Sequence, residues 1–167
     1  WTHASGAQIP LERIGIDTGF ATQETYAFIR SLKDPRVMGM KGQGHGAALI
    51  GTPTKLDINR QGKRLRRGIQ VYPVAVGIAK LEFYNHLGKL PGVAEDGMTP
   101  IYPAGYVHLP RMDAEYLQQL CAEQLVTHRD RRGYAKREWQ KLRDRNEALD
   151  CYVYARAAAA AAGLDRF

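Results

Sequence analysis

The sequence has few of the residues that build zinc centres. It holds two cysteines, Cys121 and Cys151, which do not form a C-x-x-C pair, and its five histidines are scattered without ligand spacing. Structural zinc sites need several Cys or His residues at short, regular spacings. The composition therefore argues against a zinc site, and the low cysteine content suggests a reducing compartment.

Long apolar runs and common hydrolase motifs are also absent. No stretch approaches the ~18 apolar residues of a membrane-spanning helix, so we expect no membrane partner. The sequence has no G-x-S-x-G or H-E-x-x-H motif, so a hydrolytic triad is not supported. The glycine-rich residues 42–46 lack the spacing of a phosphate-binding loop, and no clear helix follows them. We predict a flexible surface loop there.

Positive charge is what the sequence has in excess. Lys and Arg number 24 against 17 Asp and Glu, and the formal net charge is +7. An acidic partner is indicated, with nucleic acid first and an anionic membrane second. The length fits one domain with a real core, so residues 1–167 are taken as a single domain. Because the chain begins at Trp1 rather than Met, we expect it to be a piece of a longer polypeptide.

The N-terminal third predicts a strand, a helix and a second strand. The strand covers residues 11–17, the helix starts at a Thr22 cap, and the second strand covers residues 37–40. This order indicates an α/β layer with a parallel pair. Sites in open α/β sheets gather at the carboxyl ends of strands, where Asp17 and Lys41 fall. The alternative for Asp17 is that it only caps the turn at Thr18-Gly19.

A cationic segment follows within what we predict to be a long loop. Two interpretations stay open: it tracks a phosphate backbone, or it is a solvated charged surface. The cations of this segment are Arg60, Lys63, Arg64, Arg66 and Arg67.

The middle of the chain predicts shorter elements. A strand over residues 69–76 is interrupted by Pro73, which indicates an edge or a bulge. A helix is expected over residues 78–87, with Ile78, Leu81, Tyr84 and Leu87 on one side. An irregular loop should cover residues 91–103, and a short strand residues 106–109.

The segment before the last helix predicts a capped helix and a hairpin. Asp113 should cap a helix that runs to about Leu125, with Glu123 near its end. The alternative for Glu123 is a solvent-facing position on the helix without a functional role. A β-hairpin is expected over residues 127–139, around Arg132-Gly133.

The last predicted helix carries a second acidic candidate. Asn146 and Asp150 are four residues apart and share a face, beside an apolar stripe that includes Leu149 and Val153. A carboxylate beside a core must be paired, hydrogen-bonded or bound to metal. The alternative is an ordinary Asp favoured by the helix dipole. Together Asp17 and Asp150 suit Mg²⁺ or Mn²⁺, although spacing alone does not bring them together.

A series of short motifs then occurs in one order along almost the whole chain. The motifs are Ile16-Asp17-Thr18-Gly19, Tyr26, Met40-Lys41-Gly42, Ala79-Lys80, Val107-His108-Leu109-Pro110, Gln119-Leu120-Cys121-Ala122-Glu123, Trp139, Arg145-Asn146-Glu147-Ala148-Leu149-Asp150-Cys151 and Val153-Tyr154-Ala155. This series resembles the C-terminal nuclease part of the large terminase subunit of lambda-like tailed phages. The Asn-Glu-Ala-Leu-Asp-Cys run is its most specific piece.

The resemblance implies a ribonuclease H-like mixed sheet with flanking helices, lacking its first strands in this chain. It implies a DNA endonuclease that cuts concatemeric viral DNA with two divalent metals, Mg²⁺ or Mn²⁺, and no ATP chemistry in this part. Asp17 and Asp150 would be catalytic metal ligands, and Lys41 would contact phosphate. Glu123, Asn146 and Glu147 would be accessory. The implied partners are double-stranded viral DNA, the terminase small subunit and the portal or procapsid, in the cytoplasm of a bacterial host.

Two departures from the family pattern stand out. The first acidic residue of the family lies on an opening strand that we expect to precede Trp1, so one metal ligand should come from there. Relatives often carry an Asp before the Ala-Lys pair, where this chain has Gly77-Ile78. An inactive prophage remnant, compatible with both departures, remains an alternative. So does a non-catalytic DNA-binding or docking module, which needs only the cationic segment from Arg60 to Arg67 and the Lys/Arg-rich segment from Arg129 to Arg145.

Overall fold

The computed structural model describes residues 2–58, 61 and 64–166. The chain divides into two compact units. The first unit is Trp1–Ala79 with Tyr152–Phe167, and the second unit is Lys80–Cys151. Helices α2 (Val76–Leu87) and α4 (Glu147–Ala161) each begin in one unit and end in the other.

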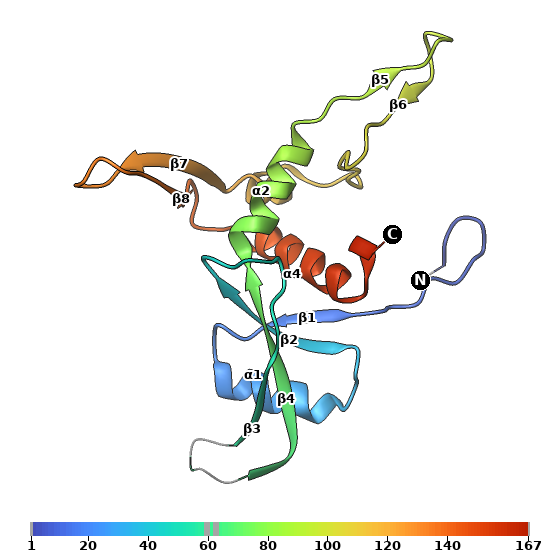
Figure 1. The fold of residues 1–167 in the computed structure, drawn as a ribbon. Coiled ribbons are helices and arrows are strands. Elements are labelled where there is room, and N and C mark those ends of the chain that lie inside the picture. The colour runs from blue at the N-terminus through green and yellow to red at the C-terminus, as the bar shows by residue number, and fades with distance from the viewer. Residues whose placement is uncertain (1, 59–60, 62–63, 167) are drawn as a thin grey trace. The chain divides into compact units, whose positions relative to one another are not determined.

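The first unit is built on a four-stranded mixed sheet in the order β1-β2-β4-β3 (Figure 1). Strands β1 (Ile14–Asp17), β2 (Val37–Gln43) and β4 (Arg64–Ala75) are parallel, and β3 (Thr54–Ile58) pairs antiparallel to β4. Helix α1 (Thr22–Leu32) connects β1 to β2. The predicted strand–helix–strand with a parallel pair is confirmed.

Alternation along the strands sends side chains to two cores. Ile29 of α1 packs with Ile69 and Val71 of β4. Met38, Met40 and Val74 pack with Val153, Ala157 and Ala158 of α4 in the other core. Helices α1 and α4 therefore cover opposite faces of the sheet, and the apolar stripe predicted on the last helix is confirmed.

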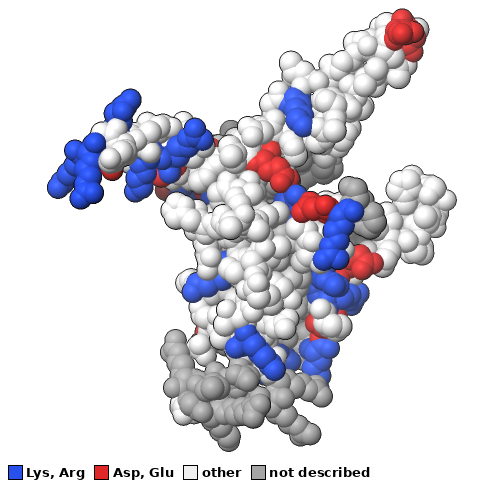
Figure 2. Space-filling view, in the orientation of Figure 1, with Lys and Arg blue, Asp and Glu red and all other residues white. Residues whose placement is uncertain are grey.

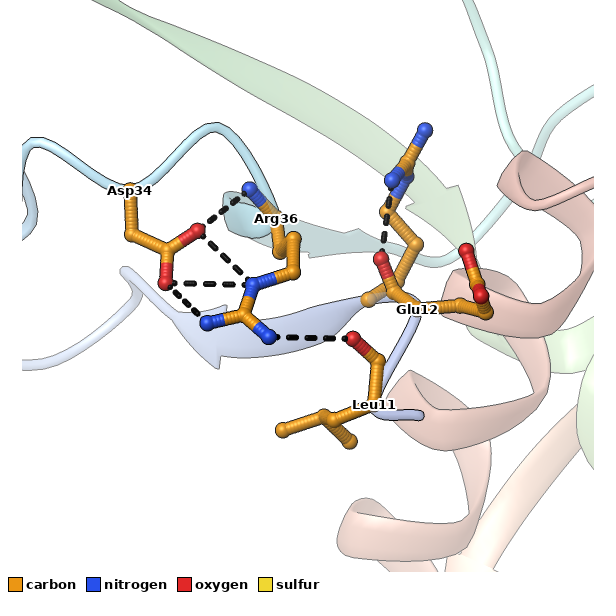
Figure 3. Close-up of polar contacts among 5 residues, drawn as sticks. Leu11, Glu12, Asp34 and Arg36 are labelled. Carbon is orange, nitrogen blue, oxygen red and sulfur yellow. Dashed lines mark hydrogen bonds and ion pairs between the residues drawn. The ribbon is translucent and has the colours of Figure 1, made fainter. Parts of the chain in front are cut away.

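An ion pair fixes the approach to this sheet (Figure 3). The Arg36 guanidinium lies 2.7 Å from Asp34 Oδ2, and its Nη1 donates to Leu11 O at 3.4 Å. The side-chain hydrogen bonds from Arg36, followed by its backbone N–H, hold the pKa of Asp34 at about 2. Residues before β1 are thus tied to the turn before β2.

Three predictions for this unit are wrong. The expected long loop contains β3 and the first residues of β4, which pair with each other. Pro73 is not on an edge, because β4 lies between β2 and β3. The register of β4 with β2 runs past Pro73 without a shift, so there is no bulge between these strands either. On the other side of β4, Pro73 O accepts from Gly51 N at 2.9 Å, before β3 begins. Thr22 does not cap α1; its hydroxyl donates to Thr18 O at 2.9 Å.

The second unit has two hairpins, one whole helix and parts of two others. It contains the rest of α2, the short pair β5 (Gly92–Val93) and β6 (Pro100–Ile101), and α3 (Ala114–Leu120). It then contains β7 (Glu123–Arg129), β8 (Ala135–Lys141) and the start of α4. The Asp113 cap is confirmed, since Asp113 Oδ1 accepts from Tyr116 N at 2.8 Å. The hairpin around Arg132-Gly133 is also confirmed and is longer than predicted.

Other boundaries in this unit differ from the prediction. Helix α3 ends at Leu120 rather than Leu125. Residues 106–109 are not a strand; Tyr106 and His108 instead make ring contacts with each other and with Tyr102. The irregular loop over residues 91–103 contains the β5–β6 pair. Ile78, Leu81 and Leu87 are exposed, and the buried residues of α2 are Ala79, Lys80 and Phe83.

Candidate functional site

Asp17 is the last residue of β1, as predicted, and it is exposed. Its Oδ1 accepts from Gly19 N at 2.9 Å, so it does hold the turn. The same oxygen accepts from the Tyr154 hydroxyl at 2.9 Å. Buried Thr18 fixes the end of the strand, because both its N–H and its hydroxyl donate to Met40 O. Asp17 is therefore a carboxylate with a defined orientation at a strand end.

Lys41 lies next to this strand end in the sheet register, one residue after Met40, the partner of Asp17. It is exposed, and β2 continues beyond it to Gln43. Within the described part of the chain it has no ion pair. An exposed, unpaired ammonium is compatible with a phosphate contact and does not by itself indicate one.

The second unit buries an ion pair. Lys80 Nζ lies 2.7 Å from Glu123 Oε2, and the two residues are only 7% and 6% exposed. The expectation that Glu123 ends a helix is wrong, as is its solvent-facing alternative: it opens β7 and is buried. Buried charges of opposite sign persist when they are paired and hydrogen-bonded, and both conditions hold here.

Asn146 extends this pair to Asp150. Its Nδ2 donates to Glu123 Oε1 at 3.0 Å and to Asp150 Oδ2 at 3.1 Å, and its Oδ1 accepts from Lys141 Nζ at 3.0 Å. The predicted shared face of Asn146 and Asp150 is thus confirmed. We call Lys80, Glu123, Lys141, Asn146 and Asp150 the amide-centred cluster. Its two cations and two carboxylates balance formally, and one carboxamide joins them.

Neighbouring groups hold the cluster in place. Gln119 Oε1 accepts from Ala148 N at 3.2 Å, at the start of α4. The Tyr84 hydroxyl donates to Leu120 O at 3.1 Å and accepts from Glu123 N at 3.4 Å. Burial raises the pKa of Tyr84. Helix α3, strand β7 and helix α4 are therefore joined by side-chain bonds around Glu123.

Sequence reasoning missed Lys80, Gln119 and Lys141 as members of this arrangement. Lys80 and Gln119 occur in the motif series, but their apolar surroundings in sequence gave no chemical signal. Glu147, predicted as accessory, is exposed and lies 3.4 Å from Arg145 Nε, outside the cluster.

The predicted DNA-binding cations are only partly described. Arg60 and Lys63 lie outside the described residues. Arg64, Arg66 and Arg67 belong to β4, where only their backbone is described. Their contact with DNA stays a prediction.

Two features are absent from the described residues. Residues 2–58, 61 and 64–166 hold no group of three or more His, Cys, Asp or Glu side chains placed to bind one metal ion. Within the same ranges, every helix is too short or too polar to span a bilayer.

Comparison with known proteins defines the class. The family model "Terminase large subunit gpA, endonuclease domain" matches residues 1–167. The chain belongs to this family, so its class is that of a phage terminase endonuclease domain.

Two relatives make the assignment more particular. The chain is 34% identical over 164 residues to the terminase large subunit of Escherichia phage lambda, and 30% identical over 161 residues to that of Enterobacteria phage P21. Each match covers 95% of this chain but 23% of the relative. The chain thus spans about a quarter of the length of these relatives. No solved structure matches it.

Proposed function

We propose that this chain is a metal-dependent DNA endonuclease domain that cleaves concatemeric viral DNA during genome packaging. The observation that carries the proposal is the position of Asp150, which the amide-centred cluster holds in a chain that the terminase endonuclease family model matches throughout. The mixed sheet with helices on both faces supports the ribonuclease H-like architecture as part of this proposal.

The chemistry of the carboxylates fits a hard divalent cation. Asp17 and Asp150 would hold Mg²⁺ or Mn²⁺ through carboxylate oxygens, which these ions prefer. Within the described residues, Asp17 Oδ2 accepts no hydrogen bond. Glu123 would support the site, because one of its oxygens accepts from Lys80 and the other from Asn146. A bound ion would supply activation of water and stabilisation of charge at the scissile phosphate.

The residues around Asp150 would act through its orientation. Asn146 would position the Asp150 carboxylate, and Glu123, which is paired with Lys80, accepts from the Asn146 amide. Outer groups of this kind fix the direction of a metal ligand. Lys41 and the cations between Arg60 and Arg67 would contact DNA phosphates. The small subunit, the portal or procapsid, and the host cytoplasm complete the proposed setting.

The test is plasmid cleavage with Mg²⁺ or Mn²⁺ by the full polypeptide that carries this chain. Asp150→Asn should abolish cutting and leave the circular dichroism spectrum unchanged. Asp144→Asn, an exposed Asp in the approach to the same helix, should cut like the parent. Retained cleavage by Asp150→Asn would refute the assignment. DNA binding without metal-dependent cutting in the parent would favour a non-catalytic DNA-binding module or an inactive prophage remnant.

A further inference from the structure

The β7–β8 hairpin carries a cationic surface that the proposed metal site does not use. Seven cross-strand pairs join the strands, from Glu123 with Lys141 at the base to Arg129 with Ala135 at the turn. Figure 2 shows Lys and Arg side chains gathered over this hairpin, which lies at the left of Figure 1.

Pairing sorts these side chains onto two faces, because directly opposed residues of a ladder point the same way. One face carries Glu123 and Lys141, then Leu125 and Trp139, then Thr127 and Arg137, then Arg129 and Ala135. The other carries Gln124 and Gln140, Val126 and Glu138, and His128 and Lys136. We call the first the arginine face.

The two faces differ in how their charges are matched. On the opposite face Lys136 Nζ lies 3.6 Å from Glu138 Oε2, and His128 also lies beside Glu138. On the arginine face the only carboxylate is Glu123, buried at the base with Lys80. Arg129 and Arg137 are exposed, and each stands opposite a small residue, Ala135 or Thr127. Their guanidinium groups have no carboxylate partner within the described residues.

The base and the turn both hold the arginine face in a fixed form. Trp139 stacks on Tyr84, with ring centroids 5.5 Å apart and planes at 24°. At the turn, Asp130 Oδ1 accepts from Arg132 N and Tyr134 N, so this carboxylate is bonded to the backbone of the turn. Arg129 Nη1 donates to Gly133 O at 2.9 Å, so Arg129 is oriented and keeps other donors.

We propose that the arginine face of the β7–β8 hairpin binds the phosphate backbone of double-stranded DNA. A two-stranded ribbon with unmatched guanidinium groups has the shape and charge to lie against a duplex. Arg129 and Arg137 make the contacts, with Arg131 and Arg132 extending the charge around the turn. The face starts at Lys141, a member of the amide-centred cluster, so duplex bound there runs toward Asp150. The choice of duplex DNA as the ligand rests on the proposed function.

The test is duplex binding by this chain in EDTA, measured by fluorescence anisotropy with a labelled 30-base-pair duplex across a salt series. Arg129→Ala/Arg137→Ala should reduce the slope of log K against log salt by about 1.8 and weaken binding roughly tenfold at 150 mM salt. The adjacent Lys136→Ala removes one charge from the opposite face and should change the slope by less than about 0.3. Arg129→Lys/Arg137→Lys should keep most of the slope, because the salt dependence comes from the positive charge of the two side chains.

Several outcomes overturn the proposal. They are an unchanged slope in the double alanine variant, an equal effect of Lys136→Ala, and failure of the parent to bind duplex. Binding of polyglutamate in place of duplex, with the same arginine dependence, would assign an acidic protein partner instead. If the double variant fails to fold, loss of the slope in the lysine variant refutes the phosphate contact. EDTA removes divalent metal, so the binding test does not depend on the proposed nuclease activity. If binding depends on the arginines but no metal-dependent cutting occurs, only the proposed nuclease function is refuted.

Discussion

Asp17 and Asp150 have the same proposed role but very different surroundings. Asp17 is exposed and is held by one backbone amide and one phenol hydroxyl. Asp150 is held by an amide whose other partners are a buried carboxylate and a lysine. The first carboxylate is positioned by a turn, and the second by a network that joins three elements of the second unit. Removing a group that holds the carboxylate should therefore lower stability more around Asp150 than around Asp17.

The largest effect is expected at Lys80. Lys80→Met leaves the Glu123 carboxylate buried without its cation, which should lower the free energy of unfolding by about 3–5 kcal/mol. Urea denaturation measures this. The exposed Lys136→Ala should cost less than about 1 kcal/mol. Lys80→Met/Glu123→Leu should recover much of the loss, and a loss below ~1 kcal/mol for Lys80→Met alone would contradict the pairing.

Asn146 tests the link between the buried pair and Asp150. Asn146→Ala removes an amide that donates to both carboxylates, and the unfolding free energy should fall by about 1–3 kcal/mol. If Asp150 holds a metal, Mn²⁺ affinity measured by electron paramagnetic resonance should fall ~10-fold. Asn85→Ala, at an exposed position of α2, is the matched control. Unchanged stability would show that the amide does not hold the cluster together.

Tyr154 tests the weaker support at Asp17. Tyr154→Phe removes one hydrogen bond to an exposed carboxylate, so stability should fall by less than about 1 kcal/mol. Thermal unfolding measures the change, with the exposed Tyr134→Phe as the control. A loss equal to that of Asn146→Ala would remove the contrast between the two carboxylates.

The smallest effect concerns Asp34, a carboxylate that is held by an arginine two residues further along the chain. Because Arg36 holds the pKa of Asp34 at about 2, its contribution to stability is present above the unfolded pKa of about 3.8 and is lost as pH falls through about 2. Arg36→Ala should return the pKa toward 3.8, as measured by carboxyl NMR titration. Asp96, whose pKa of about 2 depends first on its hydrogen bond from Thr99, should not change.

Local signals in the sequence were enough to predict several elements. The Asp113 cap, the Arg132-Gly133 turn, the parallel pair around α1 and the Asn146–Asp150 face all depend on contacts within a few residues or on simple chain order. The resemblance supplied what local signals could not: the position of Asp150 within a motif. These features of the fold and site needed no knowledge of distant contacts.

The wrong predictions concern elements and side chains whose position depends on contacts between residues far apart in the sequence. Leu125 continues the apolar pattern of α3, yet the chain turns at Cys121 so that Glu123 can pair with Lys80 of α2. Gly51 and Pro53 indicated a continuing loop, but they are followed by β3, whose partner strand β4 begins within the cationic segment, at Arg64. Lys80 reads as a surface lysine until its partner 43 positions away is known. A buried charge pair of this kind has no periodic signal.

The run of alanines in α4 limits which substitutions this helix can accept. Ala157 and Ala158 are buried in one core with Met38, Met40 and Val74, so this part of the helix packs on the sheet through methyl groups. A larger side chain at either position would lift the helix by a fraction of its own width, and the Tyr154 hydroxyl would move away from Asp17. Substitutions at these two chemically inert positions would thus be restricted, because the distance between the Tyr154 hydroxyl and Asp17 depends on them. We expect such positions to vary as little in relatives as the carboxylates themselves.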